Sequence, residues 1–243
     1  MAIAEIRTAG NPPATPVGQS ADYSAAGLTL GGAARIFWRT FNARVLALAF
    51  LASLVCRVVL GGWRWWDLAI AGIVLGVQPF TEWLIHVFVL HAKPRHVGSV
   101  TFDGLLARKH RAHHASPKVI ALVLVPRRAL VTSVVVAVPL YWLIVGMNWR
   151  LALSWLVVAY GMFLTYEWVH FLIHSSYKPK RAYYRYVYKA HRLHHFRNEN
   201  YWYGVTVHLA DHVLHTFPDK DDVPVSQTAF TLGVDVAGIE PAA

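Results

Sequence analysis

The chain has a single cysteine, Cys56, among 243 residues. It can therefore form no internal disulfide, and a metal site within it would not be built from thiolates. Charged residues are also scarce, at 15%, and acidic residues are the fewest, with 13 Asp and Glu against 23 Lys and Arg. Residues 1–32 lack the basic start and compact apolar segment of a secretory signal, so we expect no cleavage there.

Hydrophobic residues are abundant instead, at 56% of the chain, and ten of them are tryptophan. This excess is typical of a membrane protein. The net charge of +10 raises the question of nucleic acid binding. The basic residues cluster beside apolar runs, however, so we expect contact with a lipid bilayer and no nucleic acid partner.

Four apolar runs are long enough to cross a bilayer, with help from their flanks. They occupy residues 45–60, 68–90, 129–147 and 151–173. Short turns at 61–67 and 148–150 join them in pairs, while the apolar run 119–125 is too short to span and is expected at the interface. We therefore predict an all-α integral membrane fold of four transmembrane helices, arranged as two hairpins with a helical cap.

Lysine and arginine are concentrated before the first run, in 91–128 and in 174–200, whereas the two hairpin turns carry only Arg64 and Arg150. The positive-inside tendency then places both termini and the cap in the cytoplasm, at a bacterial inner membrane or the endoplasmic reticulum. Arg57, near the end of the first run, is expected to extend toward the opposite surface. We predict three parts: a flexible tail (1–32), a membrane-embedded domain (33–217) and a C-terminal tail (218–243).

Ten of the fourteen histidines form two matching sets. Each set has a pair at the end of an apolar run, followed by a His-x-x-His-His triplet. The first comprises His86, His91, His110, His113 and His114, and the second His170, His174, His191, His194 and His195. On a helix, positions i, i+3 and i+4 share a face, so each triplet can converge on one point. The repeat predicts that two half-sites meet in one polynuclear metal centre.

Imidazole binds iron, zinc, copper and nickel, so ligand type does not choose the metal. The pair His86 and His91 lies about 140° apart on an ideal helix, so it must straddle a site or lie where the helix ends. Glu82 and Glu167 have same-face spacing to His86 and His170. We expect each to orient a ligand imidazole, the alternative being a pairing with nearby Lys or Arg.

The other histidines lack this support. His96 follows Pro94 and is expected in a loop. The spacing of His208, His212 and His215 is helical, but their role stays open.

The order His-x4-His, His-x2-His-His, His-x3-His, His-x2-His-His between two apolar hairpins resembles the fatty acid hydroxylase/sterol desaturase superfamily. The resemblance covers about residues 40–217. It implies an integral-membrane, oxygen-dependent di-iron enzyme in which the ten histidines bind the metal. Gly204, Thr206, Asp211 and Thr216 match a further stretch common in the family, in which Asp211 is a candidate to orient metal ligands, but His215 stands where glycine is usual.

The resemblance implies hydroxylation of a lipid chain, fatty acyl or acyl-lipid, by O₂ at two irons, which zinc could replace in purified protein. The chain has no Gly-rich nucleotide fingerprint and no cytochrome b5-type haem motif. Electrons should therefore come from a separate ferredoxin or cytochrome b5 type protein. The basic stretch from Lys178 to Arg197 could dock an acidic partner or attract anionic lipid.

Alternatives within the superfamily are a sterol desaturase and a carotenoid-ring hydroxylase. From other classes we consider a bis-histidine haem electron carrier, a zinc hydrolase and a metal transporter. Haem would need single histidines facing each other within spans, and a zinc hydrolase about three ligands. The substrate, the carbon attacked, the choice between hydroxylation and desaturation, the donor and the oligomeric state stay open.

Overall fold

The structure of the protein, a computed structural model, describes residues 27–234. Most of the predicted N-terminal tail and the last nine residues lie outside that range. A first short helix, α1 (Leu30–Trp38), begins with the side chain of Thr29 accepting a hydrogen bond from the Gly32 amide. The boundary predicted between residues 32 and 33 therefore falls inside a helix.

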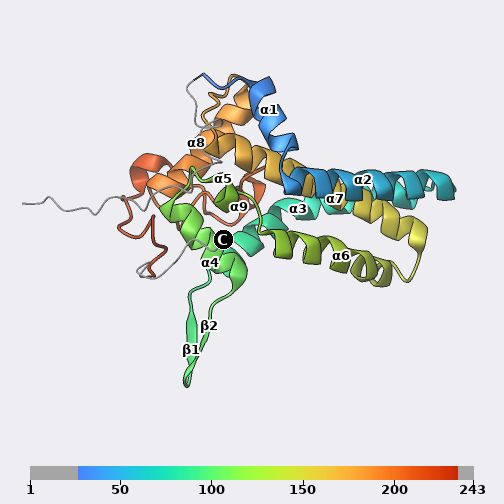
Figure 1. The fold of residues 1–243 in the computed structure, drawn as a ribbon, viewed down its shortest axis with the longest axis horizontal. Coiled ribbons are helices and arrows are strands. Elements are labelled where there is room, and N and C mark those ends of the chain that lie inside the picture. The colour runs from blue at the N-terminus through green and yellow to red at the C-terminus, as the bar shows by residue number, and fades with distance from the viewer. Residues whose placement is uncertain (1–26, 235–243) are drawn as a thin grey trace, which may run out of the picture.

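Four long helices form the body of the molecule (Figure 1). They are α2 (Phe41–Leu60), α3 (Trp65–Leu84), α6 (Arg127–Ile144) and α7 (Trp149–His174). All four belong to helical stretches long and apolar enough to cross a membrane, namely 41–60, 65–90, 120–144 and 149–174. The prediction of a mostly helical fold with four helices apolar and long enough to span a membrane is confirmed.

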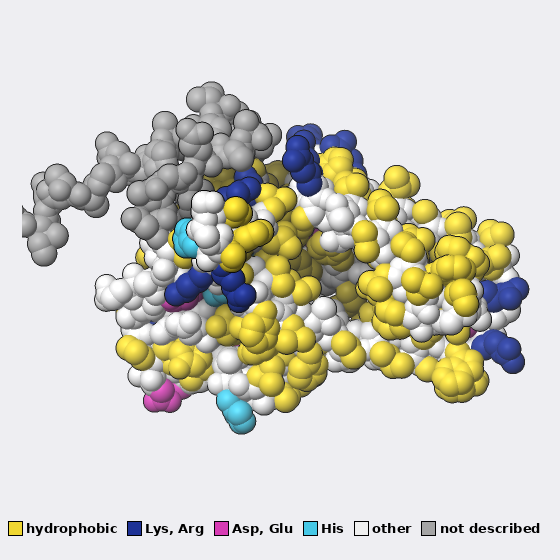
Figure 2. All heavy atoms as spheres, turned by 90° about the horizontal axis from the view of Figure 1, so that it is seen from below, with side chains coloured by type: hydrophobic (Ala, Val, Ile, Leu, Met, Phe, Trp, Pro, Cys, Tyr) yellow, Lys and Arg dark blue, Asp and Glu magenta, His cyan; other side chains and the backbone are white. Residues whose placement is uncertain are grey.

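Helix α7 is the central element, because it packs against α2, α3 and α6. It is also the most buried span, with 44% of its most apolar window inside the protein against 11–22% for the others. The outer faces of the other helices stay apolar and exposed. Figure 2 shows hydrophobic side chains over this bundle, with lysine and arginine side chains at its far end and near its junction with the cap.

Tight turns close both hairpins. Gly61 and Gly62 have φ of 54° and 63°, values in the left-handed region that glycine adopts without steric cost. Between α6 and α7, the side chain of Asn148 accepts hydrogen bonds from the amides of Arg150 and Leu151 and so starts α7.

Shorter elements make a cap at one end of the bundle (Figure 1). They are α1, α4 (Leu105–Ala115), α5 (Ile120–Val123), α8 (Ala182–Phe196), α9 (Leu209–Val213) and the 3-10 turn η2 (Lys220–Asp222). Residues beyond 217 belong to this cap: Val223 packs with Ala190 and Trp202, and its carbonyl accepts a hydrogen bond from Arg197. The boundary predicted at 217 thus divides residues that pack together.

One element was not expected from the sequence. Strands β1 (Arg95–Val97) and β2 (Val100–Phe102) form an antiparallel hairpin that projects sideways from α4 (Figure 1). Gly98 supplies the positive φ, 61°, that its turn requires. This small sheet is the exception to the all-α prediction in the described part of the chain.

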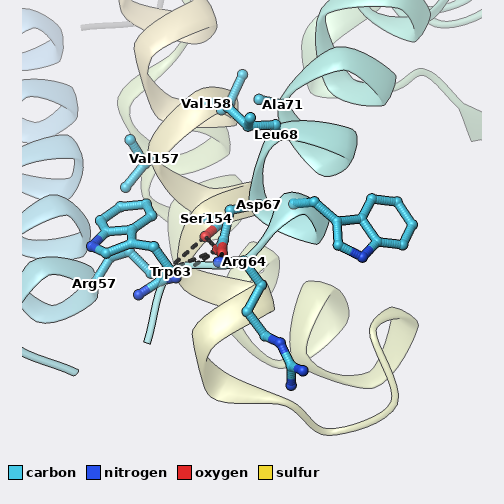
Figure 3. A pocket seen from close by; sticks show the side chains of 10 residues that line it. Arg57, Trp63, Arg64, Asp67, Leu68, Ala71, Ser154, Val157 and Val158 are labelled. Carbon is cyan, nitrogen blue, oxygen red and sulfur yellow. Dashed lines mark hydrogen bonds and ion pairs between the residues drawn. The ribbon is translucent and has the colours of Figure 1, made fainter. Parts of the chain in front are cut away.

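A buried charge cluster ties the two hairpins together at the end opposite the cap (Figure 3). Arg57 on α2 is fully buried and lies 2.7 Å from an oxygen of Asp67 on α3. Its Nε also donates to Ser154 on α7, and its Nη1 to the carbonyl of Gly61. The guanidinium lies 3.8 Å from the ring centre of Trp63. The expectation that Arg57 extends to the surface is wrong, because Asp67 gives it a partner inside the bundle.

We predict that Asp67→Asn destabilises the protein by about 3–5 kcal/mol, because it leaves a buried guanidinium without its counter-charge. Replacing Arg57 and Asp67 together by apolar residues should cost less than the single change. The measurement is the unfolding midpoint in detergent. Asp221→Asn, at an exposed ion pair with Lys220, is the control and should leave the midpoint unchanged. Equal midpoints for Asp67→Asn and the parent protein would contradict the assignment.

Candidate metal centre

The two triplets lie on the two main helices of the cap. His110, His113 and His114 are on α4, and His191, His194 and His195 are on α8. All six side chains are buried, at 0–7% exposure. Their i, i+3, i+4 spacing turns each set toward the interior, which is the arrangement expected of helical triplets.

A change of helix type explains the five-residue spacing of the first pair. After α3 the chain continues as a π-helix, η1 (Ile85–Leu90), and the amide of His91 donates to the carbonyl of His86. This i→i+5 hydrogen bond widens the turn, so that two residues five apart face the same side. The ring centres of His86 and His91 consequently lie 4.9 Å apart.

The structure brings all ten histidines together in two groups of five, and within each group one ring nitrogen per residue lies within 4.8 Å of the others. The first group is His86, His91, His110, His114 and His194, and the second is His113, His170, His174, His191 and His195. Each group takes four histidines from one half of the chain and one from the other. The histidine that crosses over is the middle member of each triplet, His113 or His194.

The nitrogen spacing fits coordination of one ion by each group. In the first group, Nε2 of His110 lies 3.1 Å from that of His86 and 3.2 Å from that of His114. In the second, Nε2 of His191 lies 3.0 Å from that of His174 and 3.1 Å from that of His195. Ligands at about 2.1 Å from an ion and at right angles to each other would be about 3.0 Å apart, against about 3.4 Å in a tetrahedron. The spacing favours five or six ligands.

The two groups lie side by side. The rings of His114 and His195, the last members of the two triplets, stack with centres 4.1 Å apart at 26°. One belongs to the first group and the other to the second. The arrangement therefore suits a pair of neighbouring ions, and the two halves of the sequence repeat contribute to them equally, with four histidines to one group and one to the other.

Backbone carbonyls orient three histidines of the first group. Nδ1 of His86 lies 2.6 Å from the carbonyl oxygen of Tyr203, and Nδ1 of His194 lies 2.8 Å from that of Tyr201. Nδ1 of His114 lies 2.8 Å from the carbonyl oxygen of Ala229. A carbonyl can only accept, so each Nδ1 must carry the proton, which leaves Nε2 with a free lone pair for a metal.

The loop that supplies two of these carbonyls is held from both sides. Glu82 accepts hydrogen bonds from the amides of Val205 and Thr206, the latter at 2.9 Å. Asp211 accepts from the amides of Tyr203, at 2.9 Å, and Gly204, at 2.7 Å. A side chain at position 204 would come within 2.9 Å of both Asp211 and His208, so glycine is required there.

Neither Glu82 nor Glu167 orients a ligand imidazole by a direct hydrogen bond, since within residues 27–234 neither carboxylate bonds to a histidine. Each instead holds a backbone amide of a cap segment. Glu167 accepts from the Val125 amide at 3.0 Å and from the side chain of Asn42 at 3.2 Å. Neither pairs with lysine or arginine in this part of the chain. These two carboxylates accept hydrogen bonds from amides. Because backbone amides occur at nearly every residue, the sequence gives no sign of which ones are the partners.

Burial controls the protonation of the imidazoles. Loss of solvent, together with repulsion from neighbouring imidazoles in their protonated form, lowers the pKa of His114 and of His194 to about 3. The pKa of His110, His113, His191 and His195 also lies well below the usual value for the same two reasons. The groups are therefore neutral at physiological pH, the form that binds a metal.

The undecided histidines lie outside both groups. His208 is buried, with Nδ1 2.9 Å from Asp211. Burial would raise the pKa of Asp211, but hydrogen bonds from His208, Thr216 and the Gly204 amide lower it below its usual value. His212 Nε2 lies 2.9 Å from the Tyr186 hydroxyl. His215 has φ of 57°, the left-handed backbone that glycine adopts most readily, at the position where the superfamily usually has glycine.

Buried ring nitrogens without hydrogen-bond partners are consistent with a site that binds metal ions. Within the described range, eight buried ring nitrogens of the two groups have no hydrogen-bond partner. They are His91 Nε2, His113 Nδ1 and Nε2, His170 Nδ1 and Nε2, His191 Nδ1, His194 Nε2 and His195 Nδ1. An unpaired buried nitrogen costs free energy, and coordination would remove part of that cost.

Comparison with known proteins found one matching family model and one similar solved structure. The model of a family described as fatty acid hydroxylase matches residues 71–216, more than half of the chain and all ten histidines. No curated protein matched the sequence. A solved structure described as "Full length scs7p (only hydroxylase domain visible)" has a TM-score of 0.60 at 20% identity, covering 79% of this chain and 69% of that chain. At that identity the likeness shows the fold.

We predict that His194→Ala lowers the metal content of the protein, because it deletes the one ligand that α8 gives to the first group. The measurement is metal content per protein by mass spectrometry. His96→Ala is the control, since His96 lies on the exposed hairpin against Thr101 and away from both groups. Equal metal content in the two variants would overturn the division of the histidines.

We predict that the metal-free protein loses stability as pH falls below 6.5. The folded-state pKa of the buried histidines lies below the ordinary value of 6.5, so under that pH the unfolded chain binds protons that the folded chain does not. The effect grows between pH 6.5 and about 3 and is absent at pH 8. Unfolding midpoints of chelator-treated protein test this, and a midpoint that stayed level on acidification would contradict it.

Proposed function

Since the chain belongs to the fatty acid hydroxylase family, we propose that it is a membrane-bound, non-haem di-iron enzyme that hydroxylates a lipid chain with dioxygen. The observation that carries the proposal is the convergence of ten imidazoles, eight of them buried, into two adjacent groups of five at one end of four apolar helices. All ten would be metal ligands. A haem iron takes its protein ligands on its axis, whereas here five nitrogens gather around each point.

The donor set favours a redox metal. Ten neutral nitrogens and no thiolate suit iron, and five donors per group exceed the four usual for structural zinc. Two iron ions bound there would supply the redox chemistry that lets dioxygen attack an unactivated C–H bond, which zinc does not supply. Zinc could still occupy the site in purified protein, because imidazole binds both metals.

The chain itself would orient the ligands and keep water out. Carbonyls of Tyr201, Tyr203 and Ala229 fix three imidazoles, and the 201–206 loop is held by Glu82 and Asp211. Eight of the ten histidines are buried, so solvent has little access. The centre lies where the spans end, so an acyl chain would reach it from the bilayer.

The overall reaction needs an external reductant. Conversion of R–H and O₂ to R–OH and water consumes two electrons and two protons. We propose that a separate ferredoxin or cytochrome b5 type protein delivers the electrons. The basic segment leading into and along α8 would be its docking surface: Lys178, Lys180, Arg181, Arg185 and Lys189. Attraction to anionic lipid is the alternative role of these residues.

The same basic residues determine the orientation that we propose. Lysine and arginine are dense in the cap, while Arg64 and Arg150 lie at the opposite end of the bundle. The positive-inside tendency then puts the cap, with the histidines, in the cytoplasm. The membrane would be a bacterial inner membrane or the endoplasmic reticulum.

We predict that iron-loaded protein, given an electron donor and lipid under ¹⁸O₂, transfers one labelled oxygen atom to a lipid chain. Lipid mass spectrometry measures the label, and comparison of cells with and without the protein identifies the substrate class. His194→Ala should give no labelled product, whereas His96→Ala should match the parent. Unlabelled lipid from the parent protein across all lipid classes would count against hydroxylation.

A further inference from the structure

The β1–β2 hairpin has one apolar and one polar face. In its register Arg95 pairs with Phe102, His96 with Thr101 and Val97 with Val100. Side chains alternate between faces along a strand, so Val97, Val100 and Phe102 share one face. His96 and Thr101 share the other, where the Thr101 hydroxyl lies 2.9 Å from His96 Nδ1.

The apolar face has no partner within the described part of the chain. Val97 is 66% exposed, Val100 52% and Phe102 62%. The apolar side chains of a strand usually pack against another part of the protein or a partner. A two-stranded hairpin alone has only marginal stability in water. An alternating pattern with its apolar side uncovered therefore indicates that something outside this fold covers it.

The position of the hairpin points to the bilayer. It follows the membrane-spanning stretch 65–90 after only four residues, and the last turns of that stretch expose Leu84, Ile85 and Phe88. It projects sideways, across the direction of the long helices (Figure 1), and so along the membrane surface and not away from it. The exposed apolar face thus continues the apolar surface of the bundle.

The charges beside this face fit lipid headgroups. Lys93 precedes the hairpin and Arg95 lies on its apolar face, both exposed. The hairpin from 93 to 102 contains no acidic residue. Apolar side chains flanked by lysine and arginine are the composition of interfacial segments, in which the cations meet anionic headgroups and the apolar groups enter the acyl boundary.

The base of the hairpin is fixed to the helix that carries the first triplet. Arg111 on α4 donates to both carboxylate oxygens of Asp103 at 2.5 Å and to the carbonyl of Ala92 at 2.9 Å. Arg111 is 1% exposed and stands between His110 and His113. The position of the hairpin is thus coupled to the position of α4.

We propose that the β1–β2 hairpin is an interfacial membrane anchor. Its Val97, Val100 and Phe102 side chains enter the headgroup–acyl boundary of an anionic bilayer, with Lys93 and Arg95 on the headgroups, and so fix the height of α4 above the membrane. This role is independent of the reaction proposed above and holds or fails separately from it.

Site-directed spin labelling tests the proposal in the full chain. Cys56→Ser removes the one native cysteine. Val97→Cys, Val100→Cys and Phe102→Cys then report on the apolar face, and His96→Cys and Thr101→Cys are matched controls on the other face. Each labelled protein is placed in nanodiscs of phosphatidylcholine with phosphatidylglycerol, and its accessibility to oxygen and to a water-soluble nickel chelate is measured by electron paramagnetic resonance.

We expect severalfold lower accessibility to the nickel chelate, and higher accessibility to oxygen, at 97, 100 and 102 than at 96 and 101. The difference should shrink in Lys93→Gln/Arg95→Gln protein and in discs of phosphatidylcholine alone. Retained metal content shows that each variant is folded, because none of the labelled positions contacts the ten histidines.

Three outcomes would overturn the proposal. Equal exposure of all five positions to the chelate would place the hairpin in water, and equal protection of all five would bury it in protein. Protection of the apolar face with spin–spin broadening that disappears on dilution with unlabelled protein would assign the face to a second copy of the chain.

Discussion

The structure depends on bringing ten imidazoles into a space that is largely closed to solvent. Each ring has two nitrogens that need a hydrogen-bond partner or a metal. The rings stay neutral at neutral pH, because burial and neighbouring rings oppose the charge of an imidazolium. Helices alone cannot meet this demand, since their backbone groups are used internally. The protein meets part of it with loops whose carbonyls reach the rings, at Tyr201, Tyr203 and Ala229. The remaining buried nitrogens make the cap a strong candidate for a metal-dependent fold.

The crossing of His113 and His194 changes what each half of the chain can do alone. Without the crossing, each hairpin and its triplet would carry a complete five-nitrogen group. With it, neither group is complete until α4 and α8 lie against each other. Metal binding would then stabilise the contact between the halves as well as each half. The stacked rings of His114 and His195 lie at that contact, so separating the two groups would break this stacking.

Much of this organisation could be predicted from the sequence because it depends on periodicity. The length and hydrophobicity of the runs predicted the bounds of α2, α6 and α7 and the start of α3 to within four residues. The i, i+3, i+4 spacing predicted the shared face of each triplet. What could not be predicted depends on contacts distant in sequence. Backbone carbonyls occur in every residue, so nothing marks Tyr201 or Ala229. The π-turn that aligns His86 with His91 has no residue signature, and Glu82 has the spacing to reach His86 but bonds to amides 123 and 124 residues away.

The two buried polar clusters at opposite ends of the bundle differ in whether their polar groups have partners within the protein. At the far end, Arg57, Asp67 and Ser154 satisfy one another and join α2, α3 and α7. At the cap end, the carboxylates are satisfied by amides while ring nitrogens are left over. Buried polar groups that complete one another contribute to a specific fold, whereas groups left incomplete are costly unless a ligand completes them. By that criterion the far cluster holds the helices together, and the cap is where a ligand belongs.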